Sequence, residues 1–270
     1  MREIIFTKMV GNGNDFVVID NRDNHILEKD KSNIARSICL RRWSIGADGM
    51  LLIECSKTGD FIMRVFNPDG GEAEMCGNGA RCAVKFAFLK LYKKQKISME
   101  TKAGLIKAQV EKDTVSLSMT EPVQIRLNLN LKFKEMTKEV SFINTGVPHV
   151  VFFTDNLEKV NVSKLGKEIR YYPEFFPHGT NVNFVQVISD NVIKVRTYER
   201  GVEDETLACG TGSVASAVIS YLKKNVSVPV SVITKGGELR VHFKEKDRKI
   251  HNVLLEGKAS VVYEGKINIV

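Results

Sequence analysis

Two cysteines open two copies of one short motif in this sequence. Cys76 begins the segment Cys-Gly-Asn-Gly, and Cys209 begins Cys-Gly-Thr-Gly 133 positions later. After each copy, apolar residues recur at the i, i+3, i+4 spacing of an amphipathic helix, which predicts a cysteine at each helix N-terminus. The partial positive charge there lowers the pKa of a thiol from about 8.5 and favours the thiolate. Two such thiols could remove a proton from one face of a carbon atom and deliver a proton to the opposite face.

The residues that follow each cysteine could bind the substrate of such a reaction. Glycine lets the backbone approach a ligand closely, and the first amides of a helix can hold an anion such as a carboxylate. These are the amides of Gly77, Asn78, Gly210 and Thr211. A carboxylate bound there would place its α-carbon beside the sulfur, and configuration would invert without any cofactor. For a single copy, a buried helix-start cysteine or a disulfide is the commoner explanation, whereas two matched copies favour catalysis.

The repeat extends well beyond the cysteines. Three glycine pairs share the 133-residue offset: Gly13 and Gly146, Gly46 and Gly179, and Gly104 and Gly237. Two further pairs lie 132 apart: Arg64 and Arg196, and Asn67 and Glu199. Glycines kept at one offset mark backbone positions that only glycine fits, so they predict two halves with the same chain path. A period this long indicates a duplicated domain.

Strand patterns dominate both halves, and helices are few. Besides the two helices that follow the cysteines, the sequence predicts helices at 32–43 and 162–169. The predicted fold class is α+β, with two pseudo-symmetric duplicated domains, each a strand-rich, barrel-like sheet around a central helix, and the active site in the interdomain cleft. The predicted domains are 1–120, completed by a C-terminal strand at 259–270, and 121–258, with a linker near 121–138.

Composition narrows the class of protein. With 270 residues, 43% hydrophobic and 27% charged, the chain is typical of a globular protein with a sizeable core. It has no signal-peptide pattern and no apolar run of membrane length, which predicts a cytoplasmic protein with no membrane contact. Five cysteines without a C-x-x-C pair or a nearby histidine cluster predict no metal site. The net charge is +8, and the basic residues gather at helix ends and in one hairpin-like stretch. This distribution predicts a solvated surface and no nucleic acid partner.

Five motifs together resemble the diaminopimelate epimerase family over essentially the whole chain. They are Gly11-Asn12-Gly13-Asn14-Asp15-Phe16, Gly46-Ala47-Asp48-Gly49, Phe66-Asn67-Pro68-Asp69-Gly70, the segment Cys76-Gly77-Asn78-Gly79-Ala80-Arg81-Cys82, and Tyr198-Glu199-Arg200-Gly201 followed by Ala208-Cys209-Gly210-Thr211-Gly212. The resemblance implies a cofactor-independent epimerase of lysine and cell-wall precursor biosynthesis. It would interconvert LL- and meso-diaminopimelate by two-thiol proton transfer, without pyridoxal phosphate, as a homodimer.

The resemblance also implies roles for individual residues. Cys76 and Cys209 would be acid and base and would exchange roles with reaction direction. The amides of Gly77-Asn78 and Gly210-Thr211 would bind the reacting carboxylate. Residues implied to bind the rest of the substrate are Glu199 near the α-ammonium, and Asn14, Asn67, Asn181 and Arg200 at the distal end. His149 and Glu199 would tune the thiols.

Some alternatives stay open from the sequence. Asn181 before a strand and Asn67 before Pro-Asp-Gly are also typical of turns. Val147 stands where many family members have asparagine and Gly49 where some have glutamine, so those substrate contacts do not transfer. A sister enzyme of the same fold, such as a proline or hydroxyproline racemase or a phenazine-pathway isomerase, is the nearest rival. A basic binding module without catalysis is the rival from another class.

Overall fold

The computed structural model describes residues 2–133 and 137–269, and the chain divides into two compact units. The first unit holds the chain up to Leu117 and again from Gly257 onward, and the second is Ser118–Glu256.

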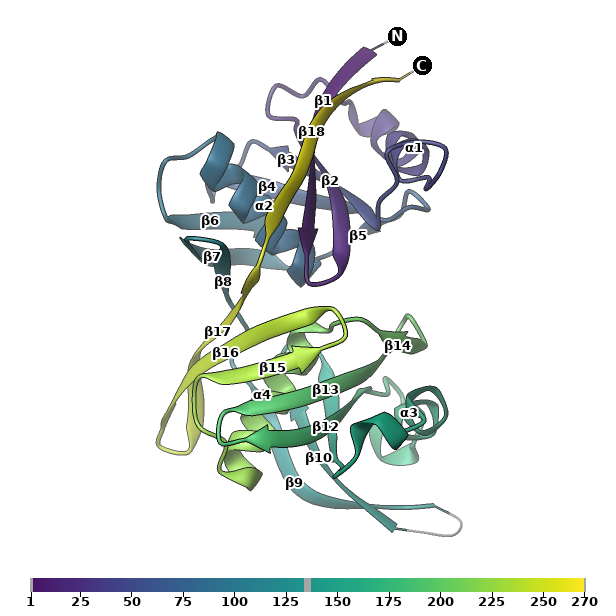
Figure 1. The fold of residues 1–270 in the computed structure, drawn as a ribbon, viewed down its shortest axis with the longest axis vertical. Coiled ribbons are helices and arrows are strands. Elements are labelled where there is room, and N and C mark those ends of the chain that lie inside the picture. The colour runs from purple at the N-terminus through teal and green to yellow at the C-terminus, as the bar shows by residue number, and fades with distance from the viewer. Residues whose placement is uncertain (1, 134–136, 270) are drawn as a thin grey trace. The chain divides into compact units, whose positions relative to one another are not determined.

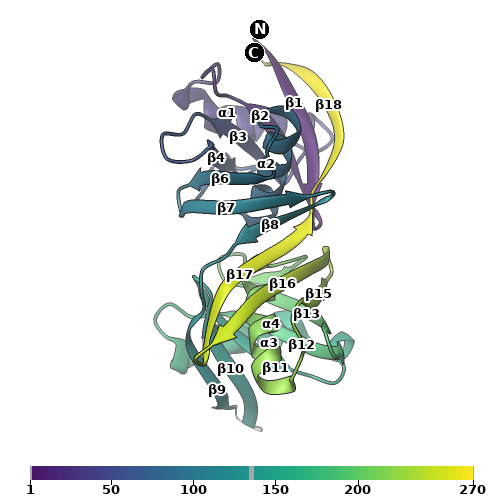
Figure 2. The ribbon, with the colours of Figure 1, turned by 90° about the vertical axis from the view of Figure 1, so that its left-hand side faces the viewer.

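The first unit is a mixed sheet with two helices (Figure 1). Its strands are β1 (Arg2–Gly11), β2 (Asn14–Asp20), β3 (Gly49–Glu54), β4 (Phe61–Phe66), β5 (Glu72–Ala73), β6 (Lys96–Thr101), β7 (Gly104–Glu111), β8 (Thr114–Ser118) and β18 (Ser260–Ile269), and its helices are α1 (Glu28–Ile38) and α2 (Gly77–Lys90). Strand β18 pairs antiparallel with β1, so the two ends of the chain run side by side (Figures 1 and 2). The pairs β2–β3 and β4–β6 are parallel, and the other described pairs in this unit are antiparallel.

The second unit repeats this arrangement. Its strands are β9 (Val123–Lys132), β10 (Thr137–Asn144), β11 (Pro148–Phe153), β12 (Asn181–Ser189), β13 (Val192–Glu199), β14 (Asp204–Thr206), β15 (Val230–Thr234), β16 (Gly237–Lys246) and β17 (Lys249–Lys258), and its helices are η1 (Leu157–Lys159), α3 (Val162–Arg170), η2 (Pro173–Phe175) and α4 (Gly210–Lys224). The parallel pairs are now β11–β12 and β13–β15.

The strand registers show that the two units follow one path. Phe16 lies opposite Gly49 in the first parallel pair, and His149 lies opposite Asn181 in the second. In both units an antiparallel hairpin follows, then a very short strand, the cysteine helix and a second parallel strand. The predicted class of two duplicated, strand-rich α+β halves is therefore confirmed.

A buried helix forms the centre of each unit. Helix α2 contacts strands β1, β2, β3, β4, β6, β7 and β18, and α4 contacts β10, β11, β12, β13, β15 and β16. Every residue of α2 from Asn78 to Ala87 is buried, as is every residue of α4 from Gly212 to Ser220. Burial on all sides goes beyond the one-sided stripe predicted from the sequence, because the sheet curves around the helix.

Two boundary predictions were wrong. The helix predicted at 32–43 is α1 and ends at Ile38, because the chain leaves helical geometry and Arg42 adopts a left-handed conformation at φ 73°. The linker predicted at 121–138 contains β9 and the start of β10, which pair with each other; residues 134–136 of that prediction lie outside the described residues.

Candidate functional site

Both cysteines are the N-cap residues of the central helices. Cys76 precedes α2 and Cys209 precedes α4, with extended backbone angles in both cases. The sulfur of Cys76 accepts the amide of Gly79 at 3.5 Å, and the sulfur of Cys209 accepts the amide of Gly212 at 3.4 Å. The predicted position at a helix N-terminus is confirmed for both residues. All five cysteines are free thiols in the structure.

The first amides of each helix take no part in the hydrogen bonds between successive turns of the helix. The intrahelical ladder starts where Ala80 donates to the carbonyl of Cys76 and Ser213 donates to that of Cys209. The four residues predicted to bind a carboxylate through their amides precede this point: Gly77, Asn78, Gly210 and Thr211. Their position gives each cysteine a neighbouring group of helix-start donors, which is the arrangement that binds anions.

Cys209 is a thiol at neutral pH. Its side chain is buried, and burial raises its pKa to about 12, with the nearby Glu199 carboxylate adding to the rise. Hydrogen bonds from the Thr211 hydroxyl and from the amides of Gly212 and Thr211 act in the opposite direction but are weaker. The prediction that the helix start favours the thiolate is therefore wrong for Cys209, because desolvation of the anion outweighs the helix N-terminus.

The side chains beneath the two cysteines differ. Strand register makes Phe16 the counterpart of His149, and Leu51 the counterpart of Asn183. A Cβ on Gly79 would lie 3.1 Å from the Leu51 side chain and 3.6 Å from the Phe16 ring. The side chains packed against the start of α2 are therefore apolar. A Cβ on Gly212 would lie 2.3 Å from the Asn183 side-chain oxygen, so the side chain packed against the start of α4 is polar.

His149 is fully buried and held in one tautomer. The Asn183 amide nitrogen donates to the Val150 carbonyl at 3.0 Å and faces Nδ1 of His149 at 3.1 Å. A carbonyl can only accept, so this nitrogen is the donor and Nδ1 of His149 the acceptor, which places the imidazole proton on Nε2. Nε2 has no hydrogen-bond partner within the described residues. Burial, and then the charge of Arg200, lower the pKa of His149 to about 3, so the ring is neutral.

Glu199 lies close to Cys209 and is stabilised from the neighbouring strand. Its Oε2 accepts the Thr206 hydroxyl at 2.9 Å. Burial raises the pKa of Glu199, and the Thr206 hydrogen bond opposes that rise. In the first unit the corresponding residues are Asn67 and Ala73, so a buried carboxylate occurs only beside Cys209 among these two matched positions.

Asn181 holds the backbone of Arg200. Its side-chain nitrogen donates to the Pro148 carbonyl at 3.0 Å, and its oxygen accepts the Arg200 amide at 2.8 Å. The Arg200 guanidinium donates to the His178 carbonyl at 3.3 Å. Both ends of the Asn181 amide thus contact backbone, as in a turn asparagine, and its distal substrate contact stays a prediction.

Asn14 and Asn78 belong to one oriented hydrogen-bond chain. Arg81 donates to the side-chain oxygen of Asn78, whose nitrogen donates to Asn14 at 2.7 Å. The nitrogen of Asn14 then donates to the Asp48 carboxylate at 3.0 Å. Because arginine only donates and carboxylate only accepts, the two ends fix the direction of both asparagine side chains.

Arg81 is completely buried within α2. It also donates to the side-chain oxygen of Asn12 at 2.7 Å, whereas its Nε and Nη1 have no hydrogen-bond partner in the part of the chain that the structure describes. Burial lowers its pKa to about 10, so the side chain stays charged at neutral pH. The first unit therefore places a buried positive charge in the helix that begins at Cys76.

Asn67 lies at the exposed start of a tight turn. Its carbonyl accepts the Gly70 amide at 2.9 Å, and its amide donates to the Gly71 carbonyl at 2.8 Å. Gly70 has φ 81°, and a Cβ there would lie 2.7 Å from the Ser32 carbonyl, so only glycine fits this position.

Within each unit the structure brings most of the predicted residues together. Asn14 and Asn78 are linked at the start of α2, Glu199 lies close to Cys209, and Asn67 stands apart on its exposed turn. The sequence assigned no role to the residues that orient the predicted ones: Asp48, Arg81, Asn183 and Thr206. Asn183 could have been found, since it is a polar residue within an otherwise apolar strand pattern, Val182-Asn183-Phe184-Val185.

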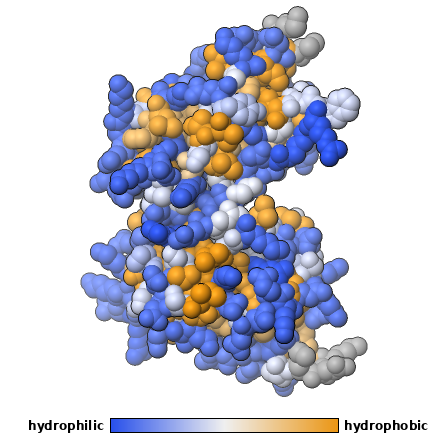
Figure 3. All heavy atoms as spheres, in the orientation of Figure 1, coloured by the Kyte–Doolittle hydropathy of each residue, from blue (hydrophilic) through white to orange (hydrophobic). Residues whose placement is uncertain are grey.

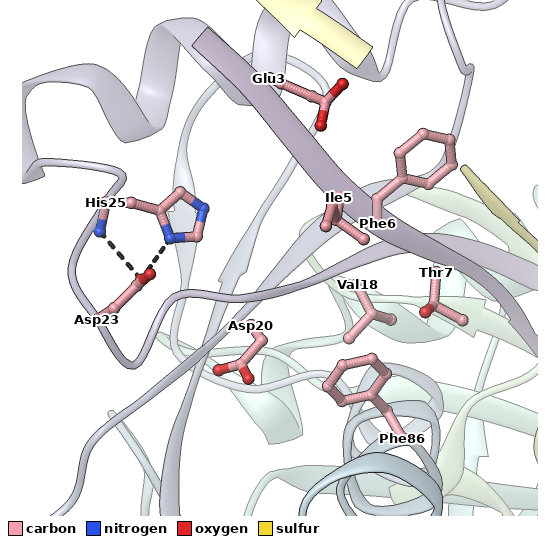
Figure 4. Close-up of a pocket in the computed structure, with 9 residues that line it drawn as sticks. All are labelled: Glu3, Ile5, Phe6, Thr7, Val18, Asp20, Asp23, His25 and Phe86. Atoms are coloured by element: carbon pink, nitrogen blue, oxygen red, sulfur yellow. Dashed lines mark hydrogen bonds and ion pairs between the residues drawn. The ribbon is translucent and has the colours of Figure 1, made fainter. Parts of the chain in front are cut away.

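Other surface features lie outside these two groups. The face in Figure 3 is mostly hydrophilic, with apolar patches on both units. A cavity of about 500 Å³ in the first unit is lined by Glu3, Ile5, Phe6, Thr7, Val18, Asp20, Asp23, His25 and Phe86 (Figure 4). None of these is a predicted site residue. Among the described residues, no three His, Cys, Asp or Glu side chains are grouped to hold a metal ion, and no helix is both long and apolar enough to cross a membrane.

Comparison with known sequences gives one consistent family. Residues 6–125 and 141–262 match the sequence family described as diaminopimelate epimerase. The chain is 46% identical to the diaminopimelate epimerase of Aquifex aeolicus, with 97% of each chain covered. It is 44% identical to that of Methanocella arvoryzae, with 100% of this chain and 98% of the relative covered.

Solved structures with lower identity share the fold. A phenazine biosynthesis protein of the PhzF family from Bacillus anthracis aligns with a TM-score of 0.74 and 18% identity, covering 100% of both chains. A probable proline racemase from Agrobacterium radiobacter aligns with a TM-score of 0.65 and 14% identity, covering 99% of this chain and 93% of that one. At these identities the likeness establishes the fold alone.

Proposed function

Because the chain belongs to the diaminopimelate epimerase family and is an isomerase, we propose that it interconverts LL- and meso-2,6-diaminopimelate by proton transfer between two thiols. The reaction requires both sulfurs to reach one α-carbon from opposite faces. The observation that supports this most is the matched pair of N-cap cysteines, each followed by helix-start amides.

The proposed step breaks one C–H bond and forms another. In one direction the Cys76 thiolate takes the α-proton, and the Cys209 thiol delivers its proton to the opposite face. Cys76 then carries the proton and Cys209 is the thiolate, so the reverse direction uses the same groups in exchanged roles. The protonated resting state of Cys209 supports its role as the first donor. The two thiols supply both acid and base, so we propose that no cofactor is needed.

The remaining predicted residues would bind the substrate. The amides of Gly77, Asn78, Gly210 and Thr211 would hold the α-carboxylate, where developing negative charge is greatest. Glu199 would contact the α-ammonium, and Arg200 would pair the distal carboxylate through its planar fork. Asn14 and Asn67 would bind the distal amino-acid end, together with Asn181.

Turnover of purified protein tests this proposal. LL-diaminopimelate is incubated without added pyridoxal phosphate, and the stereoisomers are separated by chiral chromatography. We expect meso product from the unchanged protein, and a loss of about 10²–10⁴-fold in kcat for Cys76→Ala and Cys209→Ala, since each removes a general acid or base. Cys55→Ala, at an exposed cysteine without a repeat partner, is the matched control and should keep full activity.

Two results would count against the proposal. Full activity of either site variant would exclude the two-thiol mechanism. Racemisation of proline or hydroxyproline, with no turnover of diaminopimelate, would assign the chain to a sister activity. From the family membership we also infer a homodimer, which sedimentation analysis of the purified protein can test.

A further inference from the structure

The same cluster of three charged side chains occurs once in each unit. In the first, Arg64 of β4 donates Nε and Nη2 to the two carboxylate oxygens of Glu72 in β5, at 2.6 and 2.7 Å. Lys102, in the turn between β6 and β7, approaches the same carboxylate at 2.6 Å. We call Arg64, Glu72 and Lys102 the first clamp.

The second unit repeats this geometry. Arg196 of β13 donates Nε and Nη2 to the two carboxylate oxygens of Glu205 in β14, both at 2.7 Å. Lys235, in the turn between β15 and β16, approaches that carboxylate at 2.9 Å. We call Arg196, Glu205 and Lys235 the second clamp.

The arginine and glutamate of each clamp are well shielded from solvent. The exposed fractions are 17% and 15% for the arginine side chains, and 13% for each glutamate. Bidentate, charge-assisted pairs of this kind fix geometry more strongly than single hydrogen bonds. Arg64 hydrogen bonding lowers the pKa of Glu72, while for Glu205 burial raises the pKa but Arg196 and Lys235 outweigh it. Both glutamates are therefore ionised at neutral pH.

Each arginine also ties its clamp to a neighbouring element. Arg64 donates Nη1 and Nη2 to the Glu28 carboxylate of α1, at 2.5 and 2.8 Å. Arg196 donates Nη1 to the carbonyls of Leu157 and Val160, at 3.0 and 3.1 Å, at and just after η1. The clamps therefore connect the short strands β5 and β14 to the rest of their own units.

The clamped glutamates lie just before the cysteines. Glu72 precedes Cys76 by four residues, and Glu205 precedes Cys209 by four. Strand β5 has only two residues and β14 only three, so backbone pairing alone gives these segments few hydrogen bonds. The side-chain clamps thus set where each cysteine segment begins.

We propose that the first clamp is a positioning device for the Cys76 thiol and the second clamp for the Cys209 thiol, each acting within its own half. The catalytic purpose of this positioning rests on the proposed function. The positioning itself does not, because the reactivity of a thiol can be measured without turnover.

Site-resolved alkylation tests this assignment. Glu72→Gln and Glu205→Gln are matched variants that keep side-chain shape and remove the clamp charge. Each protein is treated with iodoacetamide, and the rates at Cys76 and Cys209 are followed by peptide mass spectrometry, with exposed Cys55 as internal reference. Loosening of the segment should make its thiol more accessible, so Glu72→Gln should raise the rate roughly tenfold at Cys76 alone, and Glu205→Gln at Cys209 alone.

A second pair of variants perturbs the clamps less, so the test still applies if the glutamate variants unfold. Lys102→Met and Lys235→Met change side chains that are about half exposed and leave the arginine–glutamate pairs in place. They should raise the rate in the same half-specific pattern, by about threefold. Equal changes at both cysteines, or no change at either, would overturn the assignment. Failure of the unchanged protein to epimerise diaminopimelate would sink the proposed function, while a half-specific alkylation pattern would still support the clamps.

Discussion

At the scale of single residues, identical side chains acquire different properties from what lies beneath them. Cys76 and Cys209 share a backbone geometry and an N-cap hydrogen bond. Beneath the first lie Phe16 and Leu51, and the second has His149 and Asn183 at the matching positions. Two-thiol catalysis needs one protonated and one deprotonated sulfur at a time. Because the neighbouring side chains differ, the two duplicated cysteines are not chemically equivalent.

The buried His149 predicts a loss of stability in acid. Its pKa is about 3 in the folded protein and ordinarily 6.5, so between these values the unfolded chain binds a proton that the folded chain does not. The free energy of unfolding should therefore fall as pH drops below 6.5, by about 2 kcal/mol at pH 5 from this group. Urea unfolding at pH 7 and pH 5 measures it.

A variant isolates this contribution. His149→Phe, which copies the residue at the matching position of the first unit, should lose about 2 kcal/mol less between pH 7 and pH 5 than the unchanged protein. His178→Gln, at an exposed histidine, should behave like the unchanged protein. Equal acid sensitivity of all three proteins would show that His149 is not held neutral in the folded state.

At the scale of elements, the start of each cysteine helix is pressed against a strand. The second glycine of each motif makes this contact. A Cβ on Gly212 would meet the Asn183 oxygen at 2.3 Å and the Cys209 sulfur at 3.2 Å, whereas a Cβ on Gly77 would meet nothing within 4 Å. Gly212 therefore allows close packing of the helix start, whereas Gly77 lies in open space.

This difference predicts unequal effects of two similar substitutions on the free energy of unfolding. Gly212→Ala should destabilise the protein by about 1–3 kcal/mol, because the added methyl group overpacks the helix start. Gly77→Ala should change the free energy of unfolding by no more than about 0.5 kcal/mol, since the new methyl group has space. Urea denaturation of the two variants provides the comparison, and equal destabilisation would contradict the packing described for Gly212.

Sequence periodicity predicted the elements that carry the cysteines but not their immediate partners. Helices α2 and α4 begin where the motif and apolar spacing placed them. The links from Asn183 to His149 and from Thr206 to Glu199 join different strands, so no local pattern reveals them. The thiol pKa of Cys209 was predicted in the wrong direction because burial depends on tertiary packing, whereas the helix N-terminus is visible in the sequence.

At the scale of the whole molecule, duplication explains both what could be predicted and what could not. A shared offset of glycines predicted two halves with one path, and the matching strand registers agree with it. Pro122 and the charged residues of 121–138 are also typical of a linker, so the sequence did not reveal β9 and the start of β10. The C-terminal strand predicted at 259–270 corresponds to β18, which pairs with β1 in the first unit.

If two different thiols handle the proton, hydrogen from the solvent must enter the product at the inverted carbon, which isotope incorporation can measure. The enzyme is equilibrated in deuterium oxide and given LL-diaminopimelate without pyridoxal phosphate, and the first few per cent of conversion is analysed by mass spectrometry. Two-thiol transfer predicts that the meso product carries one solvent-derived deuterium at the inverted carbon, while recovered substrate carries almost none. Meso product that retains its original hydrogen at that carbon would contradict the account.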